Sequence, residues 1–393
     1  MKLYTFIFLS LFPILLNAQQ AIIPGTDGNG KYFFQVGNVY FQVNSKHGAR
    51  IDSYTINDEQ FLSLDTHVAD MYGSTAWLSP QSLWGWPPQD QIDKNAYTGG
   101  ISGDKVILTS AQATADGGNL KFVMRKTFSA DLSDSSVSIT YTIINKSSVA
   151  KSFAVWEIMR VPASGLSFFP LSGSITGDLN SFFLIQDGIA WWDYKTSETY
   201  KNKAFADGKS GWLAHINETR IIHIKKFPDS PSNFPSNKEM EIEFYAEPSR
   251  YYTEVEKHTD YKSIPVNDSA SMQMKWYLRE LPENIEVQEG NANIINYVNS
   301  IVNPINTSIS TKHILGQTFN LYPNPSNGEV KIISLGKVGI VNFEVLNVLG
   351  SVVYSKKVIS DEILDLHKLE KGVYFYRAYI SDVKYTGKLI LTK

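Results

Sequence analysis

The chain contains no cysteine among its 393 residues. This absence excludes a disulfide scaffold, thiol catalysis, cysteine-ligated zinc and iron–sulfur clusters. An excess of one charge is also lacking, because 36 Lys and Arg against 39 Asp and Glu give a formal net charge of -3, with no block of basic residues. Such a balance argues against binding to nucleic acid and against attraction to anionic membranes. We therefore expect no nucleic-acid partner.

Short motifs for cofactors and metals are missing as well. The sequence has no glycine-rich nucleotide-binding pattern, no GxSxG elbow, and no HxH or HExxH spacing among its 7 histidines, so we expect no cofactor and no metal site. Long amphipathic-helix stripes are absent too. Instead, 43% of the residues are hydrophobic and 13% are aromatic, many in alternating patterns. Alternation with a period of two is typical of strands, and it predicts an all-β protein with a sizeable core.

Residues 1–18 have the features of a secretory signal peptide. Lys2 supplies a positive charge, an apolar stretch follows it, and Ala18 offers a small residue at the cleavage site. The alternative, a membrane anchor, needs about 20 uninterrupted apolar residues. Because Pro13 interrupts the stretch, the sequence predicts cleavage and export of the mature chain.

The end of the chain, residues 319–393, has a separate character. It opens on the dense turn residues Tyr-Pro-Asn-Pro and continues with five short alternating runs. Runs of this length, separated by Gly, Asn, Asp or Ser, predict a small Ig-like β-sandwich. An adhesive Ig-like module is one interpretation, but it explains neither that opening nor the lysine at the end of the last strand.

Several motifs of this segment, in order, resemble a known family. They are Tyr322–Pro325, Val345–Gly350, Leu369–Tyr374 and the closing Lys388–Lys393. Together they resemble the C-terminal sorting domain of the Bacteroidetes type IX secretion system. The resemblance implies Sec export followed by type IX secretion, contact with that machinery, and either release from the cell or attachment at the outer-membrane surface.

The rest of the sequence divides into a linker and a cargo region. Residues 282–318 are rich in Asn, Ser and Thr, and their apolar residues lack a sustained period, which predicts a linker. Residues 21–281 contain recurring strand signals without a helical layer between them. About 260 residues of this kind fit one large antiparallel β-sandwich better than an alternating βαβ fold.

Four segments of the cargo region, taken in order, resemble a second family. They are residues 48–62, 77–88, 139–156 and 252–278, the second of which is rich in Trp and Pro. Together they resemble galactose-mutarotase-like (aldose 1-epimerase-like) domains, which implies a supersandwich of two large antiparallel sheets whose concave face commonly holds a sugar. True mutarotases use a His as acid and a Glu as base. The segment 146–160, where the family's His would fall, contains no His, which puts ordinary mutarotation in doubt.

Two carboxylates stand out in the strand predicted at residues 251–258. A period of two puts Tyr252, Glu254, Glu256 and His258 on one face. Neighbouring carboxylates repel, which raises the pKa of one of them and suits the pair to acid–base work on a sugar. The family resemblance favours Glu254 as the inward carboxylate, with Glu256 second. The alternative is an exposed edge strand with solvated charges.

Aromatic and arginine side chains are the other candidates for ligand contact. Trp84 and Trp86 lie in the Trp- and Pro-rich segment, and indole faces stack on the apolar faces of sugar rings. Trp156 and Arg160 share a strand face, and Arg50 lies in the opening hairpin; either guanidinium could grip a carboxylate or a pair of hydroxyl groups. The alternatives are ordinary core aromatics, and arginines that pair with a nearby Asp or Glu.

Two hypotheses of different class follow. The first is a secreted or surface-tethered protein that binds or modifies a carbohydrate ligand on an aromatic- and carboxylate-lined concave face; its enzymatic form is an epimerase-like or lyase-like activity with Glu254 as base. The second is a non-catalytic structural or adhesive cell-surface protein. The Glu254 and Glu256 pair and the tryptophan segment favour the first hypothesis, whereas the missing His favours binding over catalysis.

Overall fold

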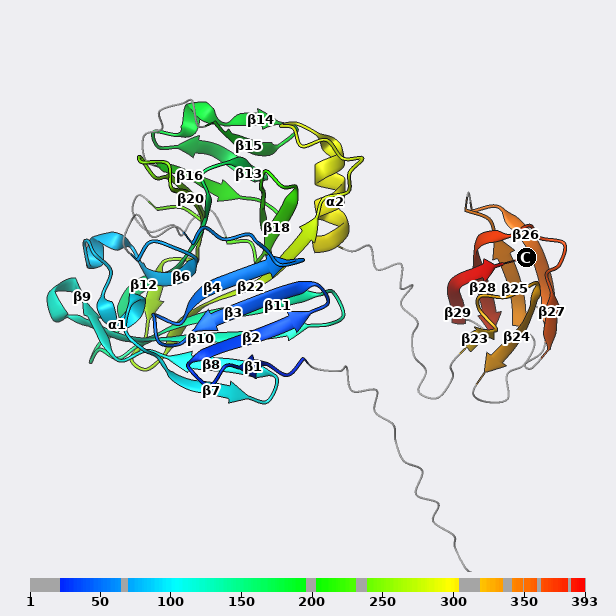
Figure 1. The fold of residues 1–393 in the computed structure, drawn as a ribbon, viewed down its shortest axis with the longest axis horizontal. Helices are drawn as coiled ribbons and strands as arrows, with labels where there is room; N and C mark the ends of the chain where they lie inside the picture. Colours follow the sequence, from blue (N-terminus) through cyan, green and yellow to red (C-terminus); the bar gives the residue numbers. More distant parts are fainter. Residues whose placement is uncertain are drawn as a thin grey trace, which may run out of the picture. The chain divides into compact units, whose positions relative to one another are not determined.

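The computed structural model describes residues 22–64, 70–195, 203–230, 239–303, 319–334, 341–348, 350–358, 362–380 and 383–392. They belong to two compact units, Met1–Val302 and Asn303–Lys393, and each is described by itself (Figure 1). The predicted signal peptide, residues 1–18, lies outside the described residues. Within the described ranges, no helix has the length and apolar character needed to cross a membrane.

The first unit is built from antiparallel strands that pair in two runs. The first run, in order of pairing, is β1 (Gly25–Thr26), β2 (Lys31–Val36), β3 (Val39–Asn44), β4 (Arg50–Ile56), β6 (Ser74–Ser79), β12 (Lys151–Pro162), β20 (Tyr252–His258), β19 (Ile242–Ala246) and β16 (Lys203–Gly208), with β5 (Glu59–Gln60) on β4 and β21 (Lys262–Ile264) on β12. The second is β7 (Thr98–Ser102), β8 (Lys105–Thr109), β10 (Leu120–Asp131), β11 (Ser136–Asn145), β22 (Ser269–Glu280), β18 (Ile221–Lys226), β17 (Trp212–Ile216), β13 (Gly165–Thr176), β15 (Ile189–Tyr194) and β14 (Leu184–Gln186), with β9 (Ala113–Ala115) on β10. The two runs join at β13, whose first half pairs with β15 and β17 and whose second half pairs with β16.

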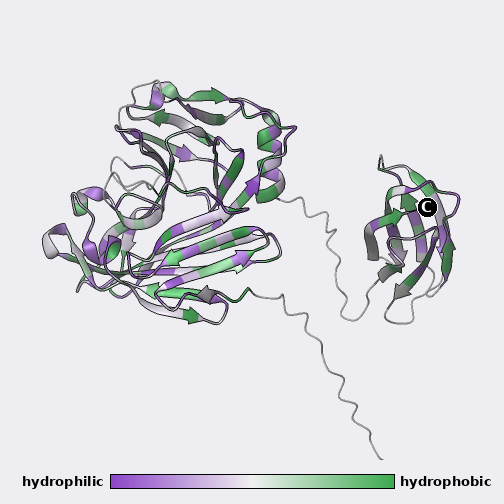
Figure 2. Cartoon of the chain, in the orientation of Figure 1, coloured by the Kyte–Doolittle hydropathy of each residue, from purple (hydrophilic) through white to green (hydrophobic). Residues whose placement is uncertain are grey.

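One hydrophobic core is shared by both runs. Val155 and Met159 of β12 belong to the same cluster of buried side chains as Phe128 of β10 and Trp276 of β22. Hydrophobic and hydrophilic residues alternate along many strands (Figure 2), so that one side of such a strand faces this core. The first unit is therefore a large antiparallel sandwich, which confirms the predicted all-β class.

The predicted linker differs from the structure in its first part. The helix α2 (Ala292–Val302) buries Ile294, Val298 and Val302 against an apolar cluster that includes Trp212, and Figure 1 shows it beside β18. Residues four apart share one helix face, and Ile295 and Ile301 pack beside it, so the helical period is present in the sequence within a stretch whose Asn and Ser content resembles a linker. The first unit therefore extends to Val302, and residues 304–318 lie outside the described residues.

The second unit consists of two small antiparallel sheets. One contains β23 (Phe319–Tyr322), β24 (Glu329–Ser334) and β27 (Ile363–Asp365), and the other contains β26 (Val352–Val358), β25 (Val341–Leu346), β28 (Gly372–Ile380) and β29 (Val383–Leu391). Val330 and Ile332 of the first sheet pack in one cluster with Phe343, Val345 and Leu389 of the second. Because both sheets cover the same apolar core, this unit is the small β-sandwich that the sequence predicts.

Candidate functional site

Five adjacent strands, β6, β12, β20, β19 and β16, carry an unusual concentration of charged and aromatic side chains on one side. Directly paired residues of antiparallel strands point to the same side of a sheet, so the register defines the members of this face. We call it the charged face; it includes Trp77 and Ser79 of β6, Trp156 and Arg160 of β12, Tyr252, Glu254, Glu256 and His258 of β20, Glu243 and Tyr245 of β19, and Lys203 of β16.

A cavity of about 340 Å³ is formed largely by this face. Its lining residues are Met71, Trp77, Gln81, Trp86, Trp156, Lys203, Tyr245, Glu247, Tyr252 and Glu254. Aromatic walls with a few polar groups are typical of small-molecule sites, which range from roughly 300 to 1,000 Å³. Other hollows of about 460, 280 and 150 Å³ are lined by none of the predicted site residues.

Glu254 is held in the cavity wall by Arg160. An Oε1 atom of Glu254 lies 2.7 Å from Nη2 of Arg160, and the two side chains are 9% and 0% exposed. The guanidinium also lies 5.4 Å from the ring centre of Trp77 and 5.5 Å from that of Tyr252. Since Trp77, Tyr252 and Glu254 all line the cavity, Arg160 contacts three of its walls and fixes the position of the carboxylate.

Trp156 is fixed from several directions. Its Nε1–H donates a hydrogen bond to Glu256, and its ring stacks on His258 with centroids 5.1 Å apart and an interplanar angle of 18°. The edge-on ring of Trp77 lies 5.2 Å away, and Nζ of Lys203 lies 5.1 Å from the Trp156 centroid. The indole is therefore a rigid wall of the cavity and needs no ordering when a ligand arrives.

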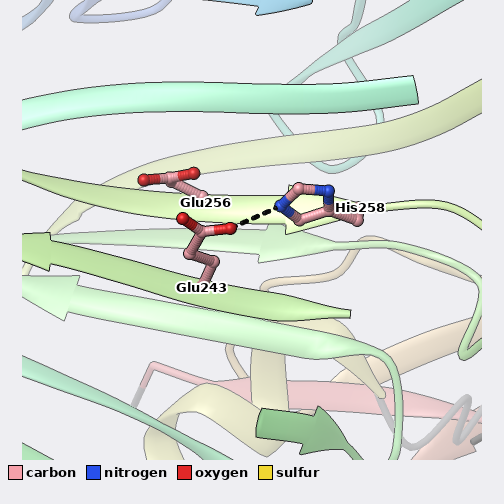
Figure 3. A group of neighbouring side chains, drawn as sticks. All are labelled: Glu243, Glu256 and His258. Atoms are coloured by element: carbon pink, nitrogen blue, oxygen red, sulfur yellow. Dashed lines mark hydrogen bonds and ion pairs between the residues drawn. The ribbon is translucent and has the colours of Figure 1, made fainter. Parts of the chain in front are cut away.

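Glu243, Glu256 and His258 form a compact buried cluster (Figure 3). Nε2 of His258 lies 3.0 Å from Oε2 of Glu243, and Lys203 pairs with the same carboxylate. Burial raises the pKa of Glu256 well above its usual range, and the charges of Glu243 and Glu254 raise it further. Burial also opposes the charge of Glu243, but the hydrogen bond and charge of His258, together with Lys203, lower its pKa. Burial and the neighbouring carboxylates thus disfavour the charged form of Glu256, whereas His258 and Lys203 favour that of Glu243.

The same three residues are the set that could hold a metal ion among the residues described. Each offers one ligand atom, and these atoms lie within 4.8 Å of one another. Sequence spacing predicts no such site, because Glu243 comes from β19 while Glu256 and His258 come from β20. In the structure, however, His258 and Lys203 already engage Glu243.

The predicted site residues divide into three groups. Glu254, Trp86 and Trp156 line the cavity, and Trp86 is 59% exposed at its edge. Arg160 and Glu256 do not line it but bind residues that do, Glu254 and Trp156 respectively.

Arg50 and Trp84 form the third group. Nη2 of Arg50 lies 2.8 Å from Oδ1 of Asp93, and both side chains are fully buried. Nε1 of Trp84 donates to the carbonyl of Leu78 at 2.8 Å, and its ring packs behind the cavity wall, edge-on to Trp77 with centroids 5.8 Å apart. For both arginines, the structure therefore shows the pairing with an acidic residue that the sequence left as the alternative.

The interpretation of residues 251–258 as an exposed edge strand is wrong. The strand β20 lies between β12 and β19, and all seven of its residues are buried. Neighbouring strands cover both edges of β20, and the burial of Tyr252, Glu254, Glu256 and His258 shows that the face they share is an inner one.

Sequence reasoning missed Lys203, Tyr245 and Glu247. Lys203 begins β16 and faces Tyr245 across the β16–β19 pair, which depends on contacts between distant parts of the chain. For Tyr245 a local signal exists, because it alternates with Glu243 in β19. Glu247 directly follows that strand and carries no local signal.

Comparison with known families identifies the second unit. Residues 320–392 match the family described as "Secretion system C-terminal sorting domain". The second unit is a type IX sorting domain. The chain is therefore secreted or carried to the cell surface by that system, and the sorting domain implies an interaction with its machinery, as the sequence predicts.

Solved structures similar to the chain include proteins described as galactose mutarotase-like. They include a putative aldose 1-epimerase from Escherichia coli K12 (10% identity, covering 64% of this chain and 99% of that chain, TM-score 0.44). Others are a galactose mutarotase-like protein from Lactobacillus casei (11%, 64% and 100%, 0.45) and a galactose mutarotase related enzyme from Lactobacillus acidophilus (9%, 66% and 99%, 0.46). No curated protein matches the chain. The likeness is one of fold alone, and no activity follows from it.

Proposed function

We propose that the first unit binds a carbohydrate in the cavity of the charged face, and that the exported chain is a carbohydrate-binding protein. The observation that carries the proposal is the meeting of Trp77, Trp86 and Trp156 with Glu254 around one hollow of about 340 Å³. Indole rings pack on the apolar C–H faces of sugar rings, and a carboxylate accepts hydrogen bonds from sugar hydroxyl groups.

The rigidity of the cavity supports this proposal. Arg160 holds Glu254 at 2.7 Å, and Glu256 and His258 hold the ring of Trp156. A site whose side chains are already ordered loses less conformational entropy on binding, which favours the recognition of small, weakly binding ligands such as sugars.

The enzymatic form of the proposal is an epimerase-like or lyase-like reaction with Glu254 as base. Its support is that Glu254 lines the cavity. Proton abstraction from a sugar also needs an acid on the other side of the ring, and Glu256, fully buried and bonded to Trp156, is not among the lining residues. Binding is therefore the function we put first.

The test is a binding screen of the purified mature chain against mono- and oligosaccharides, followed by calorimetry on Trp86→Ala and Glu254→Gln. Loss of the exposed indole should weaken binding about 2- to 10-fold, the value of one aromatic contact. The matched control is Phe375→Ala, which removes an aromatic ring that is 47% exposed in the sorting domain. Glu254→Gln keeps the shape of the side chain but removes its charge, and it should also weaken binding.

Two results would contradict the proposal. One is the absence of binding to every sugar, which would favour a structural or adhesive role. The other is binding that neither substitution changes. Following the sugar by NMR in the same samples separates binding from catalysis, because turnover that is lost in Glu254→Gln would establish the enzymatic form.

A further inference from the structure

We propose that the cavity selects sugars that carry a positively charged amine, and that Glu247 is the carboxylate that binds this amine. The inference rests on the proposed carbohydrate binding and names the class of ligand. It comes from the distribution of charge around the cavity walls.

Two carboxylates of the charged face already form ion pairs with basic side chains. Glu254 pairs with Arg160 at 2.7 Å, and Glu243 pairs with Lys203. Each of these pairs is neutral as a whole. Lys203 lines the cavity, but its positive charge is balanced by Glu243, so it offers little attraction to an anionic ligand.

Glu247 is different, because it lines the cavity without such a cation. It starts the turn from β19 to β20, in which Arg250 N donates to its carbonyl at 2.9 Å and Tyr251 N donates to its Oε2 at 3.3 Å. The residue is only 8% exposed. Among the residues that the structure describes, no Lys, Arg or His forms an ion pair with its carboxylate. A cation that enters the cavity would relieve the cost of keeping this charge away from water.

The neighbouring tyrosines indicate a negative potential at this wall. Burial raises the pKa of Tyr245, the charges of Glu254 and Glu247 raise it further, and the charge of Lys203 opposes them. Burial also raises the pKa of Tyr252, and Glu254 adds to this effect, while the charge and hydrogen bond of Arg160 oppose it. A negative potential attracts an ammonium group and repels a uronic-acid carboxylate.

The same two tyrosines supply a second attraction for an ammonium group. The ring centroids of Tyr245 and Tyr252 lie 6.5 Å apart, tilted by 44°, and both rings line the cavity together with Glu247. Aromatic faces attract cations within about 6 Å. An amine next to Glu247 would therefore meet a carboxylate and aromatic faces, while the C–H face of its sugar ring packs on the indoles.

The experiment is calorimetry on the full mature chain with matched ligands: glucose, glucosamine, N-acetylglucosamine and glucuronate, with galactose and galactosamine as a second pair. At pH 6.5 we expect the amino sugar to bind about 10-fold or more tightly than its neutral partner, because a hydrogen bond to a charged group contributes about 1.5–3 kcal/mol. Glu247→Gln should remove this preference while neutral sugars still bind. Glu218→Gln, at an exposed carboxylate outside the cavity lining, is the matched control and should keep it.

A second measurement needs no variant. A sugar amine resembles an α-amino group, with a pKa of about 7.7–8.0, so it is largely neutral at pH 9.5 and the preference should disappear there. Equal binding of each amino sugar and its neutral partner, tighter binding of glucuronate, or a preference that survives in Glu247→Gln or at pH 9.5 would overturn the inference and leave carbohydrate binding intact. If no sugar binds at all, both proposals fail.

Discussion

The two units differ sharply in what they bury. The first unit buries ionisable side chains such as Arg50, Glu157, Lys225 and Glu256, whereas Ser326 is the one buried polar residue in the described part of the sorting domain. Removing a charge from water costs several kcal/mol per ion, even when a partner repays part of it. The described core of the sorting domain thus consists of apolar side chains, while the core of the first unit also contains buried pairs of charges that must stay matched.

Deleting residues 319–393 should have the largest effect, because it removes the signal read by the secretion system and leaves the cargo core untouched. The sorting domain has its own apolar cluster, and the cargo fold ends at Val302. We expect the truncated protein to fold and to stay in the periplasm, as measured by cell fractionation. Normal export of the truncated chain would show that the first unit carries its own sorting signal.

Breaking one buried ion pair of the first unit should have the next largest effect, a loss of stability. Nζ of Lys225 lies 2.5 Å from Oε2 of Glu157, with both side chains fully buried, so Lys225→Met leaves a carboxylate without its cation. We expect the free energy of unfolding to fall by about 3–5 kcal/mol. The change should appear in tryptophan fluorescence, since all 8 Trp lie in the first unit.

The double variant Glu157→Met/Lys225→Met is the control for this prediction. Apolar side chains of similar volume often replace a buried ion pair without net loss, so the double variant should recover most of the stability. In the sorting domain, Leu389→Ala should lower the free energy of unfolding by about 2–5 kcal/mol, because it removes apolar packing. Leu389 has no charged partner, so no second substitution of a charged residue should restore this stability. If the double variant is as unstable as Lys225→Met, packing and not charge explains the loss.

The sequence predicts the strands of both units better than it predicts the site. Alternation in residues 251–258 correctly groups Glu254 with Glu256, because side-chain direction along a strand is a local property. The partners of those carboxylates are not local. Arg160 reaches Glu254 through the β12–β20 register, and Lys203 reaches Glu243 across β16 and β19.

Arg50 is a second case in which the local sequence does not identify the charged partner. The sequence offers it as a ligand contact or as half of an ion pair, and the choice depends on Asp93, which lies 43 positions away. The helix α2 has a local signal, because Ile295 and Ile301 join its three buried residues in a helical period; it was missed because the Asn and Ser content of the segment resembles a linker. Local periods thus reveal strands, while the identity of a charged partner requires the pairing of distant segments.

Lowering the pH should have the smallest of these effects, a loss of stability in the first unit. Burial, together with the charge of Lys225, lowers the pKa of His215 to about 3; burial and the same lysine also lower that of His223. The unfolded chain takes up these protons near pH 6.5, whereas the folded chain does not. The contribution of these histidines to stability is therefore complete above about pH 6.5 and is lost as the pH falls from there towards 3.

At pH 5, His215 alone should reduce the free energy of unfolding of the first unit by about 2 kcal/mol relative to pH 7, and His223 should add to the loss. Urea titrations at the two pH values, followed by tryptophan fluorescence, measure this difference. His367 lies in the sorting domain, where its side chain is 38% exposed, so His367→Gln is the control and should leave the pH dependence of the first unit unchanged. Equal stability of the first unit at pH 5 and pH 7 would mean that its buried histidines gain a proton in the folded state. In that case the contrast between the two cores would depend on the buried ion pairs of the first unit alone.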